Sequence, residues 1–378
     1  MQVSTSTYVP DHLATWQRVS PQEAGFDPGA LDRVAAFHAA HESEWPNSMY
    51  MPSGEYVGTA YIDEKPPHNT VIGPIKERGG PAGMILRGGR IVTRWGDITR
   101  PDMTFSVAKS FLGVLAGLAV ERGLIRSLDD PMADYALDDG FEGLHNSRIT
   151  WRHLLQQTSE WEGTLWGKPD SVDHNRQAGP GAVSTAKGDA RTLASPGTHW
   201  EYNDVRVNRL SLSLMQVFRQ PLPEVLDEAI MRPIGASNWV WHGYYNSRMI
   251  IDGREMESVS GGSHWGGGFQ IPTETLARFG LLIARNGVWC DRQLVPAAWI
   301  DRMLEPCPAN PIYGFMWWLN TDRKLFPSAP ETSFFALGAG QNIIWIDPAL
   351  DIVMVARWIH KDAGNGLVAT VLAGLEGG

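Results

Sequence analysis

The pattern of hydrophobic and polar positions differs between the ends and the middle of the chain. The run "AGMILRGGRIVTRWGD" (82–97) holds two β-prone segments around Gly88-Gly89, which predicts a hairpin with a tight turn. Near the other end, strands are predicted over 313–320, 342–349 and 351–359, and "DPALD" is the turn between the last two. Strands early and late predict one antiparallel sheet built from both ends of the chain.

Helical periodicity dominates between these strands, whereas residues 43–80 are rich in Pro, Gly and polar residues and are predicted to be irregular. Thr150 is a candidate N-cap and Gly123 a candidate residue just beyond a helix C-terminus. One helix is predicted to start at Asp27 or Pro28. Further helices are predicted over 106–120, over the turn after Thr150, and over 207–218, 222–235, 273–287, 295–304 and 364–378.

These elements predict an α+β fold with two parts. Residues 1–128 and 265–378 form the sheet domain, and residues 129–264 form a mostly helical inserted domain. Residues 159–197 have no clean period and are crowded with Gly, Pro, Asp and Ser. Such a long irregular segment is usually functional or disordered, and its tryptophans favour an ordered active-site loop.

Composition narrows the class of protein. The 378 residues are 43% hydrophobic, which is ample for a large core, and the formal net charge of −10 without a basic block argues against nucleic acid as a partner. We expect the two cysteines, Cys290 and Cys307, to be reduced. The N-terminus lacks the pattern of a signal peptide and no run of 18 apolar residues exists, so we expect a cytoplasmic protein without a membrane partner. The sequence does not decide between a monomer and a homodimer.

One lysine is out of place in the helix predicted over 106–120. "MTFSVAKSFLGVLAGLAVERGLI" (103–125) is apolar on nearly every face, yet it carries Ser106 and, three residues later, Lys109. Spacing i, i+3 puts both side chains on one helical face, and a buried amine is costly unless it is paired. A serine beside an amine at a helix N-terminus meets the requirements of an activated nucleophile. On its own the short S-x-x-K pattern also fits a helix cap followed by a surface lysine.

Three segments in order resemble the penicillin-recognising serine hydrolases, which include class C β-lactamases, D,D-peptidases and their esterase relatives. The first is the serine helix itself. The second is "SPGTHWEYND", which looks like the P-G-x-x-x-x-Y-x-N segment of that family, and the third is "FFALGAGQNIIWIDPALDIVMV", which looks like its third-motif strand. The resemblance covers roughly residues 20–370 and implies a β-lactamase/transpeptidase-like fold.

The resemblance also implies roles for individual residues. Ser106 would be acylated, while Lys109 and Tyr202 would share proton handling, and which of the two takes the first proton stays open. The N–H groups of Ser106 and Ala339 would form the oxyanion hole. Gly338 and Gly340 would allow the substrate to approach the strand closely.

Two departures from the family pattern concern the substrate. Asp204 stands where the family often has Asn, so it offers only acceptors and a charge that would hold Lys109 as an ammonium ion. Ala336 and Leu337 stand where lactamases have Lys or His and then Thr, so a cation for a substrate carboxylate is missing. Both changes favour a neutral or hydrophobic ester or amide over β-lactam or peptidoglycan substrates. Family VIII carboxylesterases and 6-aminohexanoate-dimer hydrolases are similar relatives.

Further candidates for the substrate cleft come from aromatic residues in polar, glycine-rich surroundings. Among the 16 tryptophans, Trp161, Trp166 and Trp265 are such candidates, although tryptophans more often serve packing. His264 in "GGSHWGGG" is a candidate too, although a hydrogen-bonded structural histidine is the more common role. The histidines show no tight metal-ligand spacing, so we expect neither a metal nor another cofactor.

The sequence therefore predicts a serine hydrolase acting on a small ester or amide, most simply a carboxylesterase. An amidase of the 6-aminohexanoate type, a β-lactamase or D,D-peptidase, and an acyltransferase are the alternatives within the same chemistry. A non-catalytic ligand-binding or sensor protein on the same fold is the alternative of a different kind. No G-x-S-x-G motif is present, which excludes an α/β-hydrolase elbow.

Overall fold

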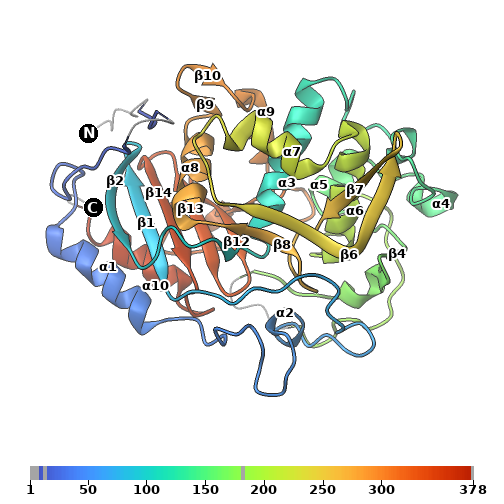
Figure 1. Cartoon of the computed structure of the whole chain (residues 1–378), viewed down its shortest axis with the longest axis horizontal. Helices are drawn as coiled ribbons and strands as arrows, with labels where there is room; N and C mark the ends of the chain where they lie inside the picture. Colours follow the sequence, from blue (N-terminus) through green and yellow to red (C-terminus); the bar gives the residue numbers. More distant parts are fainter. Residues whose placement is uncertain (1–7, 12–14, 180–183, 376–378) are drawn as a thin grey trace.

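The largest element of the fold is a six-stranded antiparallel sheet made from both ends of the chain, in the order β11-β12-β13-β14-β1-β2 (Figure 1). The computed structural model describes residues 8–11, 15–179 and 184–375. The strands of this sheet are β1 (Ala82–Arg87), β2 (Arg90–Trp95), β11 (Trp318–Leu319), β12 (Phe334–Gly338), β13 (Asn342–Asp347) and β14 (Ile352–Arg357).

Both faces of this sheet are buried, because helices cover each side (Figure 1). Alternate residues of a strand point to opposite faces, so Val353 and Val355 of β14 join one core while Ile352 and Met354 join the other. Helix α8 (Thr273–Ala284) packs on the first face, and the helix pair α1 (Pro28–Ala40) and α10 (Gly364–Leu372) packs on the second.

Most of the remaining helices lie at predicted positions, but α2 (Val57–Ala60) falls in the range 43–80 that was predicted to be irregular, and the helix predicted over 222–235 is α-helical only to Leu226. Helix α3 runs from Val107 to Glu121 with Gly123 in the left-handed region just beyond it, and the Thr150 side chain caps α5 (Trp151–Leu155). The other α-helices are α2 (Val57–Ala60), α4 (Gly143–Asn146), α6 (Asp204–Phe218), α7 (Leu222–Leu226) and α9 (Ala297–Met303). The helix predicted over 364–378 stops at Leu372, and residues 376–378 lie outside the described part of the chain.

A second, four-stranded sheet has the order β3-β8-β6-β7, and the sequence prediction missed most of it. Its strands are β3 (Asp102–Met103), β6 (Val240–Ile251), β7 (Arg254–Val259) and β8 (Gly268–Ile271). Two short pairs complete the strands, namely β4 (Thr164–Leu165) with β5 (Lys168–Pro169), and β9 (Val288–Trp289) with β10 (Arg292–Gln293). The range 129–264, predicted to be mostly helical, therefore also carries β4 to β7.

Buried ion pairs hold several points of the segment 159–197, of which residues 180–183 lie outside the described part. Glu160 is fully buried and bonds Arg191 at 2.6 Å and Arg206 of α6 at 2.8 Å. Burial acts to raise the pKa of Glu160, but these two guanidinium groups outweigh it and lower the pKa to about 2. The segment is thus tied to the helix that follows Tyr202.

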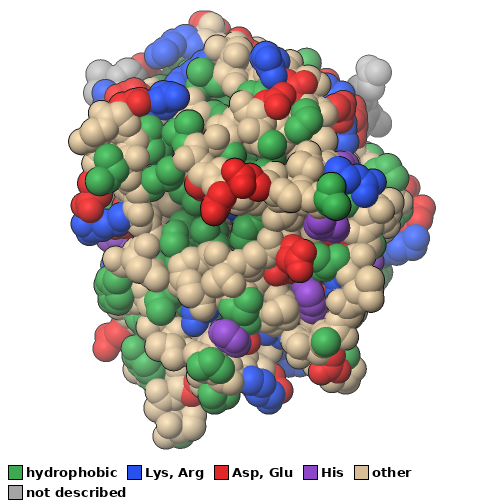
Figure 2. Space-filling model, turned by 90° about the vertical axis from the view of Figure 1, so that its right-hand side faces the viewer, with side chains coloured by type: hydrophobic (Ala, Val, Ile, Leu, Met, Phe, Trp, Pro, Cys, Tyr) green, Lys and Arg blue, Asp and Glu red, His purple; other side chains and the backbone are tan. Residues whose placement is uncertain are grey.

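The surface and the termini add little to the functional picture. Figure 2 shows Lys and Arg side chains scattered over one face instead of gathered into a stripe. Among the described residues, none of the helices combines the length and the apolar character needed to cross a bilayer. The N-terminal stretch that was searched for a signal peptide includes residues 1–7 and 12–14, which lie outside the described residues.

Candidate active site

The candidate nucleophile, Ser106, sits at the N-terminal end of the buried helix α3. The residue before it, Phe105, has a φ of 51°, a left-handed conformation that is costly for a residue with a bulky side chain. Its ring is held by edge contacts with Trp45 and Trp358, at centroid distances of 5.1 and 6.4 Å. This sharp turn leaves Ser106 partly exposed while Val107 and the following turns of α3 are buried.

Lys109 lies one helical turn further on, and its side chain is only 1% exposed. Its Nζ is 2.7 Å from Ser106 Oγ, 2.6 Å from Asp204 Oδ1 and 3.3 Å from the carbonyl oxygen of Gly261. A Cβ on Gly262 would lie 2.9 Å from Nζ, so a larger residue there would displace the amine. The apparent misfit of a lysine in an apolar helix is resolved because polar partners from three elements meet its amine.

Asp204, the first residue of α6, lies beneath the cleft instead of lining it, so its predicted role as a substrate contact is wrong. Oδ1 faces Lys109, while Oδ2 lies 2.8 Å from Arg176 Nη1 and 3.2 Å from His264 Nδ1. Burial acts to raise the pKa of Asp204, but Lys109, Arg176 and His264 outweigh it and hold the pKa well below its usual range. Asp204 is therefore the counterion of the buried amine.

Tyr202 completes a compact group with Ser106 and Lys109. Two cations lie near its ring: Lys109 Nζ is 4.8 Å from the ring centroid, and the central carbon of the Arg176 guanidinium is 5.3 Å from it. Trp318 stacks on the ring with a centroid distance of 5.5 Å and an angle of 29°. Tyr202 is thus fixed by packing and by two cations, and it lines the same cleft as Ser106.

This cleft has a volume of about 320 Å³, and backbone from β12 forms one wall. Leu337, Gly338 and Ala339 line it, as predicted, whereas Gly340 does not. A Cβ on Gly338 would lie 2.0 Å from the carbonyl oxygen of Thr104, so this glycine lets β12 approach the strand that leads into Ser106. The described residues lining the cleft are Tyr61, Ile62, Asp63, Ser106, Arg176, Gln177, Ala178, Gly179, Ser184, Tyr202, Trp318, Leu337, Gly338, Ala339, Gln341 and Lys361.

The other predicted lining residues are not part of this cleft. Trp161 and Trp265 are buried in the core, and Trp166 packs on Tyr244 at a centroid distance of 5.5 Å. His264 is buried behind Asp204 and its ring stacks on Trp265 at 3.7 Å. Glycine-rich surroundings made these residues look exposed, but long-range packing covers them.

Sequence reasoning missed most of the residues that line the cleft, among them Arg176 and Trp318. Arg176 lies in the irregular segment 159–197, where no hydrophobic periodicity indicates which side chains face the cleft. Trp318 was predicted only as part of a strand over 313–320, and its alternation with Trp317, which faces the core, was the available signal.

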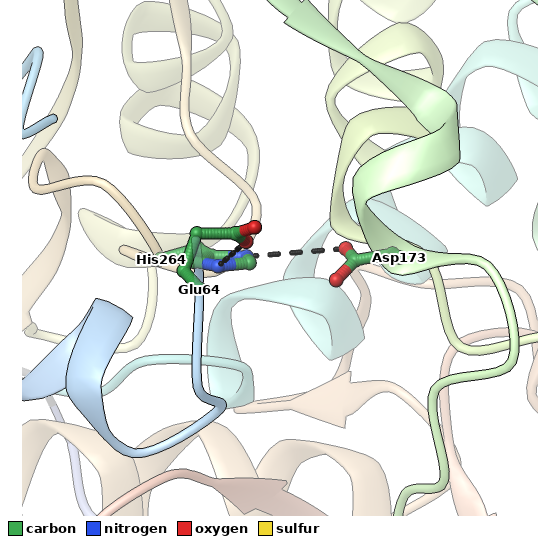
Figure 3. A group of neighbouring side chains, drawn as sticks. All are labelled: Glu64, Asp173 and His264. Atoms are coloured by element: carbon green, nitrogen blue, oxygen red, sulfur yellow. Dashed lines mark ion pairs between the residues drawn. The ribbon is translucent and has the colours of Figure 1, made fainter. Parts of the chain in front are cut away.

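Behind Asp204 lies a cluster made of Glu64, Asp173 and His264, whose oxygen and nitrogen atoms lie within 4.8 Å of one another (Figure 3). Such a set resembles a metal site in composition. However, the ammonium of Lys187 lies 2.9 Å from Glu64 Oε2 and 3.5 Å from Asp173 Oδ1, and it also donates to the carbonyl of Val172 at 2.7 Å. Because the chain supplies its own cation, we assign the cluster to internal ion pairing.

Comparison with known proteins agrees with this fold. Residues 69–364 match the sequence model of the Beta-lactamase family, so the chain belongs to that family. It is a family of hydrolytic serine enzymes. The predicted β-lactamase/transpeptidase-like α+β fold is thereby confirmed.

Individual relatives are distant. An uncharacterized protein of Alkalihalophilus pseudofirmus is 23% identical over 66% of this chain and 71% of its own length. A putative 6-aminohexanoate-dimer hydrolase from Bacillus anthracis superposes with a TM-score of 0.57 at 16% identity, over 97% of this chain and 87% of that one. EstCE1, a hydrolase with promiscuous acyltransferase activity, superposes with a TM-score of 0.55 at 18% identity, over 85% of this chain and 97% of that one. These likenesses concern the fold.

The buried cluster predicts a dependence of stability on pH. Burial acts to raise the pKa of Glu64, but His264 and Lys187 outweigh it and lower the pKa from 4.5 to about 2. A pKa that is lower in the folded state gives stability that is present above pH 4.5 and is lost as the pH falls through about 2. Glu64→Gln should therefore cost about 3 kcal/mol in the free energy of unfolding at pH 7.

Urea denaturation at pH 7, 4 and 3 measures this difference. We expect the gap between wild type and Glu64→Gln to narrow as the pH falls below 4.5, because the unfolded wild-type chain then gains a proton that the folded state, with a pKa of about 2, does not bind. Glu121→Gln, at the exposed end of α3, is the matched control and should leave stability nearly unchanged. A gap for Glu64→Gln that stays constant across this range would show that Glu64 is not held ionised by its neighbours.

Proposed function

We propose that the protein is a serine hydrolase that cleaves a carboxylic ester through a covalent acyl-Ser106 intermediate. The observation that carries the proposal is the 2.7 Å contact between Lys109 Nζ and Ser106 Oγ at the floor of the cleft. A serine hydroxyl is a weak nucleophile unless an adjacent base takes its proton. The buried amine is placed at hydrogen-bond distance for that transfer, which favours Lys109 over Tyr202 as the first base.

An ester would be cleaved in two stages, acylation of Ser106 and then hydrolysis of the acyl-enzyme. Ser106 Oγ bonds to the carbonyl carbon while its proton passes to Lys109 Nζ, and the carbonyl oxygen becomes an oxyanion. The bond from carbon to the alkoxy oxygen then breaks, and the leaving alcohol takes a proton from Lys109 or Tyr202. A water molecule then attacks the carbonyl carbon of the acyl-enzyme while it gives a proton to Lys109. The bond from that carbon to Ser106 Oγ breaks, the carboxylic acid leaves, and Ser106 Oγ takes the proton back.

The oxyanion is proposed to bind the N–H groups of Ser106 and Ala339. Both residues line the cleft, and Gly338 lets the end of β12 approach the N-terminus of α3 closely, because a Cβ there would lie 3.2 Å from Ser106 N. Fixed N–H donors at such a position typically contribute about 3 kcal/mol each to the transition state. We propose that Tyr202, whose ring centroid lies 4.8 Å from Lys109 Nζ, passes the proton to the leaving group.

The cleft favours a neutral, partly hydrophobic acyl group. Leu337, Ala178 and Trp318 provide apolar lining. Arg176, although it borders the cleft, is already paired with Asp173 at 3.3 Å and Asp204 at 2.8 Å, so its charge is compensated before a substrate arrives. An amide of the 6-aminohexanoate type is the second candidate, because a putative hydrolase of that dimer shares the fold over 97% of this chain.

Ser106 should react covalently with an active-site phosphonylating reagent. A fluorophosphonate loses fluoride to Ser106 Oγ, and we expect one adduct per chain by intact-mass spectrometry, mapped to the peptide that contains Ser106. Ser106→Ala should abolish the adduct. Ser110→Ala, one turn further along α3 and buried against the carbonyl of Met316, is the control that should still be labelled. Equal labelling of wild type and Ser106→Ala would refute the hydrolase proposal and favour a binding protein.

Substrate preference should follow the neutral lining. In a panel of p-nitrophenyl acyl esters, the matching anilides and a chromogenic cephalosporin, we expect kcat/KM to be highest for the esters by at least about tenfold. The missing cation next to Leu337 gives the cephalosporin carboxylate no partner there. Faster turnover of the cephalosporin than of any ester would contradict this specificity, while leaving the acyl-Ser106 chemistry intact.

A further inference from the structure

A second cavity, with a volume of about 410 Å³, lies next to the cleft that holds Ser106. Asp63 and Ser184 line both hollows, so the two are adjacent and these side chains form their common border. Cavities of this size are typical of sites for small molecules. The second cavity is therefore the nearest place for any part of a substrate that the cleft does not hold.

The lining of the second cavity is polar, whereas the cleft is partly apolar. Among its described lining residues, only Val172 has an apolar side chain. Four of the polar side chains make no hydrogen bond or ion pair with any residue that the structure describes, namely His68, Ser171, Thr185 and Asp189. Thr185 and Asp189 are exposed, and His68 and Ser171 are partly exposed. These four side chains are available to a ligand.

Glu64 gives this cavity a fixed, charged wall. Its side chain is 4% exposed, and its Oε2 takes both the 2.9 Å contact with Lys187 and the 3.0 Å contact with His264 (Figure 3). Its other oxygen, Oε1, accepts no hydrogen bond from the described residues. Because the pKa of Glu64 is about 2, Oε1 belongs to a carboxylate at neutral pH. A buried carboxylate oxygen without a donor is the kind of group that a ligand satisfies.

These groups select a ligand that both donates and accepts hydrogen bonds. The carboxylate oxygens of Glu64 and Asp189 only accept, so the ligand has to donate to them. The hydroxyl groups of Ser171 and Thr185 accept and also donate, so they are matched by a ligand group that does the same. An alcohol hydroxyl meets both requirements.

Charge and polarity disfavour the other classes of ligand. The described lining residues include three carboxylates, from Asp63, Glu64 and Asp189, and two amines, from Lys65 and Lys187. The excess of one negative charge opposes a carboxylate or a phosphate, and an alkyl chain finds little apolar surface to bury. An ammonium group accepts no hydrogen bond, so it leaves the hydroxyl donors unmatched.

We propose that this cavity is a subsite for the alcohol part of the ester, and that this part carries free hydroxyl groups, as in a glyceryl or sugar ester. The apolar lining of the cleft at Leu337 and Trp318 takes the acyl group, which leaves the polar cavity beyond Asp63 and Ser184 to the alcohol. The proposal rests on the proposed hydrolase function for the cleavage itself. Binding of the hydroxylated part depends on the cavity alone.

Two butyrate esters that differ only in their hydroxyl groups test this preference. Propyl butyrate and 1-glyceryl butyrate share the acyl group and a three-carbon alcohol, and only the second carries free hydroxyls. In a pH-stat assay we expect kcat/KM to be at least about tenfold higher for the glyceryl ester, because its hydroxyls bond to the cavity wall. Butyrylcholine, with a cationic alcohol, should be a poorer substrate than the glyceryl ester. Equal kcat/KM for the propyl and glyceryl esters, or a preference for butyrylcholine, would overturn the proposal.

A double variant, Ser171→Ala with Asp189→Ala, removes two of the available groups from the cavity wall. We expect the ratio of kcat/KM for the glyceryl ester to that for the propyl ester to fall by at least about fivefold. Asp32→Ala, at an exposed position of α1 outside both hollows, is the matched control and should keep the wild-type ratio. A ratio that the double variant leaves unchanged would show that these side chains do not bind the alcohol, and would overturn the proposal.

Saturation-transfer NMR on Ser106→Ala separates the subsite from the catalytic proposal. Without the nucleophile, 1-glyceryl butyrate stays intact, and we expect saturation to reach its glyceryl protons. The transfer should be lost when Ser171→Ala and Asp189→Ala are added. Such transfer in a protein whose Ser106 does not react with a fluorophosphonate would refute the hydrolase function and leave the binding site standing. No transfer to the glyceryl protons would overturn the subsite, whatever the reactivity of Ser106.

Discussion

The contact between the Asp204 carboxylate and the Lys109 amine is the constraint on which the site depends. Both side chains are at least 96% buried, and each alone would be too costly to keep charged in the interior. Their 2.6 Å pairing fixes the N-terminal turn of α3 against the first residue of α6. Because the same carboxylate also contacts Arg176 and His264, the irregular segment and the loop 260–267 between β7 and β8 are held to the same point.

The two halves of the architecture supply different parts of the chemistry. The sheet built from both chain ends places Gly338 and Ala339 next to Ser106, where we propose that backbone N–H groups bind the oxyanion. The inserted region supplies Tyr202 and the ion cluster that surrounds Lys109. The strained turn at Phe105 joins the two, since it points the serine into the cleft while α3 continues into the core.

The sequence predicted those features that depend on residues close to one another in the chain. The i, i+3 spacing of Ser106 and Lys109, the Thr150 cap and the strands of the large sheet all depend on neighbours in the chain. The second sheet was missed because β6 alternates only weakly between buried and exposed residues. Asp204 and Trp265 were misplaced because their burial depends on segments far away in the sequence, which no local period reports.

The most direct test of the central claim is the single-turnover rate of acylation in Lys109→Met, which keeps the length and apolar body of the side chain but removes its amine. We expect the formation of acyl-Ser106 from a p-nitrophenyl ester, measured by the release of nitrophenol, to slow by at least about 10²-fold in this variant, which should remain folded. Acylation at a rate close to that of the wild type would contradict this expectation, because the 2.7 Å contact between Nζ and Oγ would then have no part in activating the serine.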